Sequence, residues 1–479
     1  GITAKITRPY YLEWLASWKD KDIIKVVSGI RRAGKTTLLE LFREQLANDG
    51  IPQKNIISIN FEDPEIDAFP DYRTAWKYIR SKFPANGKAY VFLDEVQLVP
   101  DFEKVVDGLF AKKDCDVYIT GSNAKFLSGE LATFLTGRYV EIKVSPLSFA
   151  EYKSVFPEQP TEKTFNDYLR FGGFPFATLL PCGSRSMGDY LSGILDTILY
   201  KDIVARKGIR DAAMLKRLAR FIHDNIGSPL SVNKIVGTFK SDGISVPHAT
   251  LDTFLDALCE TFLVFKANRY DIKGRGYLKT NAKYYIADPG FRWVMLGDRR
   301  NDFGHLLENI VYLELCRRYR DVYVGIMGQQ EVDFVALNNG EPSYFQVALS
   351  VRDEMTLKRE LAPLEAIRDH YSKTLLTLDP DPPFDYNGIR QMNVIDFLLL
   401  PDIENNLNNC KNNLFLRTIR QTLRSKRTKG AQQIILRCAP FCIGLYYHFV
   451  FFNVANGNSS SCEFEYEFLV AGFELKIEN

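Results

Sequence analysis

The sequence predicts an α/β protein of several domains, with a parallel β-sheet in the first of them. Three observations indicate this. A short apolar run at residues 24–28 leads through a glycine-containing loop into a helix-forming run. Two more short apolar runs, residues 90–93 and 117–119, end in polar residues, as buried parallel strands commonly do. The chain has 479 residues. That length is too great for one hydrophobic core, so we expect roughly three domains.

The first motif is the loop at residues 29–36, which fits GxxxxGK[ST] between a strand and a helix. In that context the loop amides and the helix N-terminus surround nucleotide phosphates. Lys35 is expected to reach the β- and γ-phosphates, and the Thr36 hydroxyl to bind Mg²⁺. ATP and Mg²⁺ are therefore the predicted cofactors. The predicted nucleotide-binding residues of this segment are Gly29, Ile30, Arg31, Arg32, Ala33, Gly34, Lys35, Thr36 and Thr37.

Two carboxylates follow the apolar run at residues 90–93. Asp94 is expected to hold the Mg²⁺ shell, and Glu95 to polarise the water that attacks the nucleotide. A strand that ends in Asp-Glu is common, but its distance from a phosphate loop makes it specific. A glutamate at this position favours hydrolysis of the nucleotide over nucleotide sensing alone. The predicted catalytic residues are Glu95, Lys35 and Arg138.

Polar residues also end the next strand, at Ser122 and Asn123. Ligands sit at the carboxyl edge of open α/β sheets, so either side chain is a candidate sensor of the γ-phosphate. A loop cap or helix N-cap is an equal alternative. Arg138 is a candidate arginine finger, in its own site or in that of a neighbouring subunit of a homo-oligomer. A surface salt bridge is the alternative for Arg138.

The motifs GIRRAGKTT, FLDEVQ, ITGSN, LTGRYVEIKVSPLSFAEY and YLRFGGFP occur along the chain in this order. Together they resemble a prokaryotic group of predicted ATPases of the AAA+ superfamily. The resemblance runs from about residue 7 to Leu400. It implies a P-loop NTPase domain with Walker A and Walker B motifs, here at residues 1–155, and a C-terminal domain of unknown function. It implies no biological process or target.

Residues 156–210 are interpreted as a helical linker or lid. The segment LRFGGFPF contains paired glycines and a proline, which predict a rigid turn. Residues 189–209 have helical apolar spacing. Asp202 and Arg206 stand four residues apart on this helix, and we expect a solvated ion pair between them.

Residues 211–292 are predicted to form a winged helix: three helices, then two apolar strands that flank a basic, glycine-tipped hairpin. In a DNA reader the third helix would enter the major groove. That helix carries Asp252 and Asp256 and no Lys or Arg, so phosphate would repel it. Duplex DNA and a protein partner therefore remain equal alternatives. The hairpin offers a basic face, formed by Lys266, Arg269, Lys273, Arg275 and Lys279.

Residues 300–400 resemble a degenerate restriction-endonuclease core. Glu308 on a helix and Asp333 on a strand occupy the first acidic positions. The Glu-x-Lys position of that core instead reads Gln346-Val347-Ala348. Since one carboxylate and the lysine that activate water are replaced, we predict a nuclease-like scaffold without nuclease activity.

Residues 401–479 differ in character and are left unassigned. They run from an asparagine-rich stretch through a basic run to an uncharged aromatic segment at 438–455. That segment is short for a membrane span and contains polar residues, so we expect no stable membrane insertion. The eight cysteines show no zinc-site spacing. Together with an N-terminal segment unlike a signal peptide, they favour a cytoplasmic protein.

The sequence thus predicts a Mg²⁺-dependent ATP-binding protein and ATPase whose nucleotide state controls the winged-helix and nuclease-like modules. The alternative is a nucleotide-gated DNA-binding or protein-adaptor switch with negligible hydrolysis. The formal net charge of +2 does not separate the two.

Overall fold

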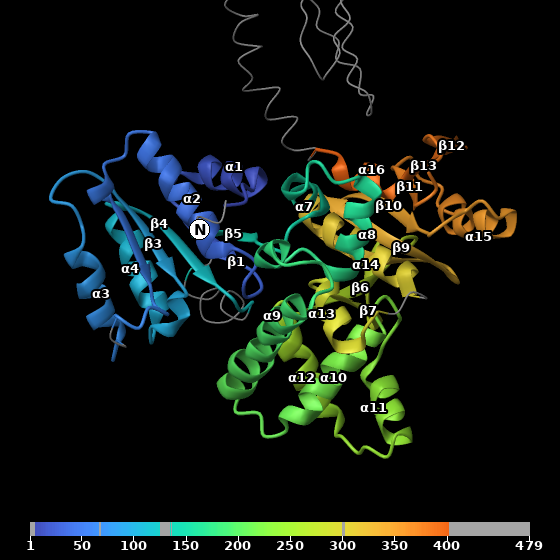
Figure 1. Ribbon diagram of the computed structural model, residues 1–479, viewed down its shortest axis with the longest axis horizontal. Helices are drawn as coiled ribbons and strands as arrows, with labels where there is room; N and C mark the ends of the chain where they lie inside the picture. The colour runs from blue at the N-terminus through green and yellow to red at the C-terminus, as the bar shows by residue number, and fades with distance from the viewer. Residues whose placement is uncertain (1–4, 67–68, 125–134, 136, 299–301, 402–479) are drawn as a thin grey trace, which may run out of the picture. The chain divides into compact units, whose positions relative to one another are not determined.

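A computed structural model of the protein (Figure 1) describes residues 5–66, 69–124, 135, 137–298 and 302–401. Of the predicted tail at 401–479, all but residue 401 lies outside the described residues. The described chain contains two β-sheets, of five and eight strands.

The first sheet is parallel throughout and has the strand order β2-β3-β4-β1-β5 (Figure 1). Every residue of β1 and β3 is buried, because helices cover both faces of the sheet. This confirms the predicted parallel α/β domain. Its strands are β1 (Ile24–Ser28), β2 (Ile56–Asn60), β3 (Ala89–Asp94), β4 (Cys115–Gly121) and β5 (Tyr139–Lys143).

Helices α1 and α2 contribute to the apolar cluster on one face of the sheet, and helices α3 and α4 to the cluster on the other face. On one face, α2 packs Phe42 against the rings of Phe92 and Tyr118, at centroid distances of 6.3 and 5.4 Å. The other face packs against α3 and α4 through a second apolar cluster. The helices of this domain are α1 (Pro9–Trp18), α2 (Lys35–Asn48), α3 (Tyr72–Ser81) and α4 (Phe102–Lys112), with the 3₁₀ turns η1 (Gln53–Asn55) and η2 (Val96–Leu98).

A helical segment follows, and it contains one unusual element. The single helix predicted at residues 189–209 is instead an α-helix, α9, that continues directly into a π-helix, η4. Rare π-helical segments occur frequently at functional sites. The elements of this segment are α7 (Phe149–Val155), α8 (Thr161–Phe171), η3 (Pro175–Leu179), α9 (Arg185–Asp196) and η4 (Thr197–Ala205).

The predicted turn at Gly172 and Gly173 has a specific cause. Gly172 has φ +76°, and a Cβ there would lie 1.7 Å from Oδ1 of Asp288. The amide of Gly173 donates to Oδ2 of the same carboxylate at 2.7 Å. Burial raises the pKa of Asp288 to about 7. Only glycine leaves room for this buried carboxylate, which ties the turn to a residue 115 positions away.

Three helices and a hairpin follow in the predicted order. The strands of the hairpin are longer than predicted, and their pairing extends to Asp271 and Gly276. These elements are α10 (Ala212–Asp224), α11 (Val232–Ser241), α12 (His248–Glu260), β6 (Val264–Asp271) and β7 (Gly276–Ile286), followed by α13 (Pro289–Leu296).

The eight-stranded sheet joins this hairpin to residues 303–399. Strand β6 pairs in parallel with β8, so the order is β12-β13-β11-β10-β9-β8-β6-β7. The predicted wing and the predicted nuclease-like core therefore share one sheet. Its other elements are α14 (Phe303–Arg318), β8 (Asp321–Met327), β9 (Gln330–Asn338), β10 (Glu341–Val347), α15 (Glu354–Glu365), β11 (Lys373–Thr377), β12 (Phe384–Tyr386), β13 (Ile389–Asn393) and α16 (Val394–Leu399).

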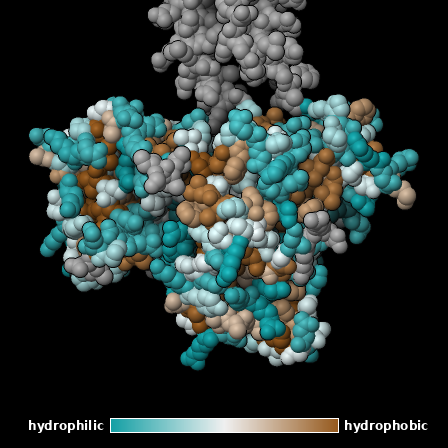
Figure 2. Space-filling view, in the orientation of Figure 1, coloured by the Kyte–Doolittle hydropathy of each residue, from teal (hydrophilic) through white to brown (hydrophobic). Residues whose placement is uncertain are grey.

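The surface drawn in Figure 2 is largely hydrophilic, with apolar colour in separate patches. Four cysteines lie within the described residues, and all four are free thiols. Over the same residues, the helices are too short or too polar for any of them to cross a bilayer.

Candidate nucleotide-binding site

The loop between β1 and α2 has the conformation that its glycines allow. Gly29 has φ +139°, and a Cβ there would lie 2.1 Å from the carbonyl oxygen of Val144. Gly34, which precedes α2, also has a left-handed φ, of +97°. Arg32 adopts φ +66°, a conformation uncommon for a residue with a side chain. The chain therefore curls tightly from the carboxyl end of β1 into the N-terminus of α2.

Lys35 begins α2 and turns back into this loop. Its ammonium donates to the carbonyl oxygens of Gly29, at 2.8 Å, and Ile30, at 3.0 Å. The residue is only 5% exposed, and burial lowers its pKa from the usual value, although Glu95 and Asp94 oppose the shift. Neutral carbonyls thus hold this cation, and no carboxylate of the described residues forms an ion pair with it.

Thr36 and Asp94 lie together, as the sequence predicts. The Thr36 hydroxyl donates to Oδ2 of Asp94 at 2.6 Å. Oδ1 of Asp94 accepts from the hydroxyl of Thr120, which the sequence analysis did not identify. A hydroxyl and a carboxylate in contact are oxygen donors that suit Mg²⁺, an ion that keeps several water ligands. The described residues contain no cluster of three or more His, Cys, Asp or Glu able to hold a metal alone, so these two residues would supply only part of the ion's shell.

Glu95 directly follows β3 in a left-handed conformation, with φ +51°. Its amide donates to the Thr120 hydroxyl at 2.9 Å, which fixes the backbone. Its Oε2 accepts from the Ser122 hydroxyl at 3.2 Å and from the side-chain amide of Gln97. The structure therefore brings Ser122 to Glu95, and it adds Gln97 as a second holder of that carboxylate.

Asn123 is buried just beyond the carboxyl end of β4, beside Ser122 in sequence. Arg138 lies at the opposite edge of the sheet. Its carbonyl oxygen accepts from the amide of Ile24, the first residue of β1, at 2.8 Å. Its guanidinium forms an exposed ion pair with Asp107 at 2.6 Å. Arg138 thus forms the surface salt bridge that was the alternative prediction. Because it is remote from the loop of its own chain, the arginine-finger prediction remains only in the version that uses a neighbouring subunit.

Arg31 makes the contact that departs most from expectation. It donates to both carboxylate oxygens of Asp202 on η4, each at 2.9 Å. A further donor nitrogen lies 3.2 Å from Glu62. Asp202 is 5% exposed, so the predicted solvated pair between Asp202 and Arg206 was wrong. Sequence spacing favoured the local pair because a partner 171 residues away leaves no local signal.

A cleft of about 1000 Å³ opens over these residues. Its polar lining includes Lys35, Thr36, Asp94 and Glu95. Its apolar lining includes Phe176 and Leu179 of η3 and Tyr190 of α9. Phe176 is 50% exposed, and its ring centroid lies 4.8 Å from that of Tyr190. The cleft therefore offers both charged and aromatic surfaces to one ligand.

A hydrogen-bonded network that starts at Arg8, itself a residue of the cleft lining, supports the loop. The guanidinium of Arg8 donates to the carbonyl oxygen of Ala33 at 3.0 Å and pairs with Glu151 at 2.7 Å. Both Arg8 and Arg317 donate to the carbonyl oxygen of Pro146, at 3.5 and 3.1 Å. The network thus leads from the phosphate loop to α14. Sequence reasoning did not find Arg8, which lies outside every recognised motif.

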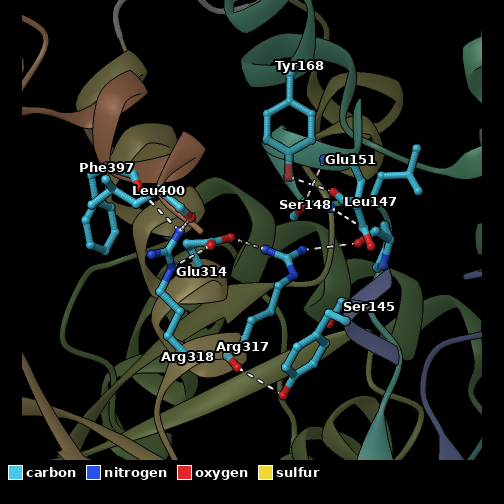
Figure 3. A network of polar contacts seen from close by, with 12 residues as sticks. Ser145, Leu147, Ser148, Glu151, Tyr168, Glu314, Arg317, Arg318, Phe397 and Leu400 are labelled. Atoms are coloured by element: carbon cyan, nitrogen blue, oxygen red, sulfur yellow. Dashed lines mark hydrogen bonds and ion pairs between the residues drawn. The ribbon is translucent and has the colours of Figure 1, made fainter. Parts of the chain in front are cut away.

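The network continues through Arg317 and Arg318 of α14 (Figure 3). Both pair with Glu314, at 3.1 and 2.7 Å. Arg318 also donates to the carbonyl oxygen of Leu400 at 2.9 Å. These contacts connect the first domain with the end of the second sheet's domain through fixed, buried groups.

The acidic residues predicted at the nuclease-like core lie in a different environment. Glu308 accepts from the ammonium of Lys283 at 3.0 Å and from the hydroxyl of Tyr285 at 2.6 Å. Lys283, from β7, also pairs with Glu331 at 2.7 Å. Asp333 accepts from the amide of Val347 at 2.8 Å, and burial together with nearby Glu308 raises its pKa well above the usual value.

Gln346, which the sequence analysis aligned with the Glu of the Glu-x-Lys pattern, donates to Glu360 at 2.9 Å and accepts from the backbone amide of Asp333 at 3.2 Å. Ala348 follows β10. The lysine that contacts Glu308 is Lys283, which comes from the hairpin strand β7.

Comparison with known proteins agrees with this architecture. Residues 21–153 match the AAA domain family, and residues 162–302 match a domain of unknown function, DUF8612. An uncharacterized protein of Haemophilus influenzae is 40% identical over 401 residues, which cover 83% of this chain and 99% of the relative. An uncharacterized protein of Methanocaldococcus jannaschii is 28% identical over 365 residues, covering 72% of this chain and 79% of that relative.

Solved structures show remote similarity. The ORC1 protein of Aeropyrum pernix, in complex with DNA, is 13% identical, with a TM-score of 0.29 over 60% of this chain and 91% of that one. A DNA polymerase III gamma subunit-related protein of Thermotoga maritima is 14% identical, with a TM-score of 0.25 over 52% of this chain and 97% of that one.

Proposed function

Since the chain belongs to a prokaryotic family of predicted P-loop ATPases of the AAA+ superfamily, we propose that it binds ATP with Mg²⁺ in the cleft and hydrolyses it. One observation carries this proposal. Lys35, Thr36, Asp94 and Glu95, which come from two separate motifs, line one cleft at the carboxyl edge of the sheet. In this proposal the nucleotide state controls the winged-helix module, residues 211–292, and the nuclease-like module, residues 300–400, through the linker at 156–210.

Each side chain has a role in this mechanism. The triphosphate lies along residues 29–36, where Lys35 exchanges the carbonyls of Gly29 and Ile30 for phosphate oxygens. Thr36 and Asp94 would hold the metal ion, which would supply positive charge beside the transferred phosphate. Glu95 accepts the proton of the attacking water.

The neighbours of Glu95 support its role as the base. Ser122 and Gln97 hold its Oε2, and Thr120 holds its backbone. A base held by its surroundings can orient water without first reorganising. In this proposal Ser122 also reports contact with the γ-phosphate, while Asn123 remains a candidate for the same role.

The apolar lining of the cleft favours a nucleotide over inorganic polyphosphate. Half-exposed Phe176, together with Tyr190, presents aromatic surface to the same space as the phosphate loop. A planar base that covers these rings would remove apolar surface from water.

Calorimetric titration with ATP and Mg²⁺, paired with steady-state turnover, tests the proposal. Lys35→Ala is expected to abolish binding and turnover while circular dichroism stays that of the wild type. Unchanged turnover in Lys35→Ala would refute the proposed site.

A nucleotide-gated switch with negligible hydrolysis is the second candidate, and α12 bears on its target. Asp252 and Asp256 are exposed on α12, whereas Lys266, Lys273 and Arg275 are exposed on the hairpin. The acidic helix favours a protein target over the major groove, because DNA phosphate would repel it. Retention of duplex DNA, with and without ATP in buffer of stated salt concentration, separates the two. Retention that depends on ATP would identify DNA as the target.

A further inference from the structure

The contact between Arg31 and Asp202 joins the phosphate loop to a helix outside the AAA-matched residues. Two parallel N–H···O bonds of 2.9 Å make it bidentate, the strongest geometry for a guanidinium and a carboxylate. Arg31 lines the cleft, and Asp202 lies behind it on η4. A residue positioned to meet phosphate is therefore held by a carboxylate of the protein itself.

The surroundings of this pair make Arg31 the partner on which Asp202 depends. Within the part of the chain that the structure describes, both hydrogen bonds of the buried Asp202 carboxylate are to Arg31. Arg31 has a second acidic neighbour, Glu62, at 3.2 Å, and Glu62 is shared with Lys201 at 3.6 Å. If Arg31 turned away, it would leave a carboxylate that is 5% exposed without its cation, a costly state in a protein interior.

A nucleoside triphosphate bound in the cleft would compete with Asp202 for the guanidinium of Arg31. Phosphate oxygens accept the same bidentate donor geometry as a carboxylate, and a triphosphate carries several negative charges where Asp202 carries one. We propose that Asp202 is a latch that holds Arg31 away from the phosphates, and that binding of the triphosphate releases it. This inference rests on the proposed function of the cleft.

Release of Asp202 has a direct structural consequence. Helix η4 packs Ile198, Leu199 and Ile203 into the apolar cluster that also contains Leu215 and Leu218 of α10. When Asp202 loses Arg31, the packed position of η4 becomes less favourable, because a buried carboxylate must regain water or another cation. Occupancy of the cleft therefore loosens the contact of η4 with the three-helix module at residues 212–260.

Thermodynamic linkage fixes the sign of the effect on affinity. A latch that opposes the bound state weakens nucleotide binding by the same factor with which the nucleotide opens the latch. Asp202→Asn removes the charge at nearly constant shape, so it is expected to tighten binding of ATP with Mg²⁺ roughly fivefold or more. Asp202→Glu keeps the charge and is expected to bind close to the wild type.

The control is Asp196→Asn, six residues before Asp202 at the end of α9, where Asp196 forms an exposed pair with Lys216. Asp196→Asn is expected to leave the affinity for ATP with Mg²⁺ unchanged. In a double-mutant cycle, Asp202→Asn is expected to have no effect on affinity when Arg31 is already alanine, because the latch acts through Arg31. Hydrogen exchange supplies an independent readout: amides of residues 197–205 are expected to exchange faster in the wild type on ATP binding, and to show no such ATP-dependent change in Asp202→Asn, which has no carboxylate to release.

The outcomes distinguish this inference from the proposed function. Wild-type protein that binds no ATP overturns both. ATP binding that Asp202→Asn weakens or leaves unchanged overturns the latch alone, since Asp202 would then position Arg31 or have no role. Tighter binding in Asp202→Asn that persists with Arg31 replaced by alanine also overturns it.

Discussion

Two regions of the molecule each gather a lysine and acidic side chains, and they use them differently. In the first domain, carbonyl oxygens hold Lys35, and hydroxyls and an amide hold Asp94 and Glu95. In the eight-stranded sheet, Lys283 is paired directly with Glu308 and Glu331. A charged side chain held by neutral partners is not neutralised, so it can still attract a ligand of opposite charge. A charged side chain in an ion pair is already neutralised by another residue of the protein. The difference indicates a ligand site in the first cluster and a structural one in the second.

Lys35 and Lys283 are about equally buried, so the contrast lies in what surrounds each of them. The first cluster lines a cleft of about 1000 Å³. In the second cluster, Lys283 is 4% exposed and contacts two carboxylates at 3.0 and 2.7 Å. Buried charges are tolerated when they are paired, and breaking such a pair is costly. A lysine and acidic residues can therefore form either a ligand site or a structural ion pair, depending on whether their charges are already paired within the protein.

Removal of Mg²⁺ is expected to cause the largest change in ATP turnover, which depends on the first cluster, and to leave the stability of the fold unchanged. Chelation of Mg²⁺ by EDTA should abolish ATP turnover, because Thr36 and Asp94 then hold no ion beside the phosphates. The midpoint of urea unfolding without nucleotide should stay the same. A fall in that midpoint after chelation would indicate a structural metal and would break the comparison.

Replacement of Lys283 should destabilise the fold strongly. Lys283→Met leaves Glu308 and Glu331 without their cation, so we expect the free energy of unfolding to fall by about 3–5 kcal/mol. Urea denaturation measures this change. Lys35→Met is the matched control: it removes a buried lysine held by carbonyls, and it should cost much less stability while losing ATP binding. The reverse ranking of the two stabilities would contradict our interpretation.

The pH dependence of stability sharpens the comparison further. The pKa of Asp333 is raised in the folded protein, so the folded state binds more protons than the unfolded state. Its contribution to stability is full below the unfolded pKa of about 3.9 and is lost as pH rises through the folded pKa. Asp333→Asn should flatten this loss in urea titrations between acidic and neutral pH. An unaltered pH profile in Asp333→Asn would count against the raised pKa.

Arg138 should give the smallest effect. Its pair with Asp107 is exposed, so Arg138→Ala should change the free energy of unfolding by less than about 1 kcal/mol. Turnover measured at dilutions where the chain is monomeric should not change, because Arg138 lies at the far edge of the sheet. Lower turnover in Arg138→Ala only at concentrations that favour association would support a finger supplied to a neighbouring subunit.

Local patterns made much of this architecture predictable. The strand, loop and helix around Lys35, the carboxylates after β3, and the three helices before the hairpin each leave a signal within about a dozen residues. The parallel sheet followed from short strands buried on both faces. These features required no knowledge of distant contacts.

The remaining features depend on residues far apart in sequence. Arg8 reaches Glu151 across 143 positions, and Arg31 reaches Asp202 across 171. The pairing of β6 with β8, which merges two predicted modules into one sheet, is likewise invisible to local periodicity. Lys283 looked like a strand residue of a hairpin until the fold placed it beside Glu308.

The most direct test of the two-cluster interpretation is steady-state ATP hydrolysis by wild type, Glu95→Gln and Glu308→Gln, measured side by side. Both substitutions remove one carboxylate charge at nearly constant shape. We expect Glu95→Gln to bind ATP and to lose turnover by roughly 10²–10⁴-fold, as for removal of a general base. Folded Glu308→Gln should turn over ATP at the wild-type rate. Equal turnover in wild type and Glu95→Gln would contradict the assignment of the first cluster as the catalytic site.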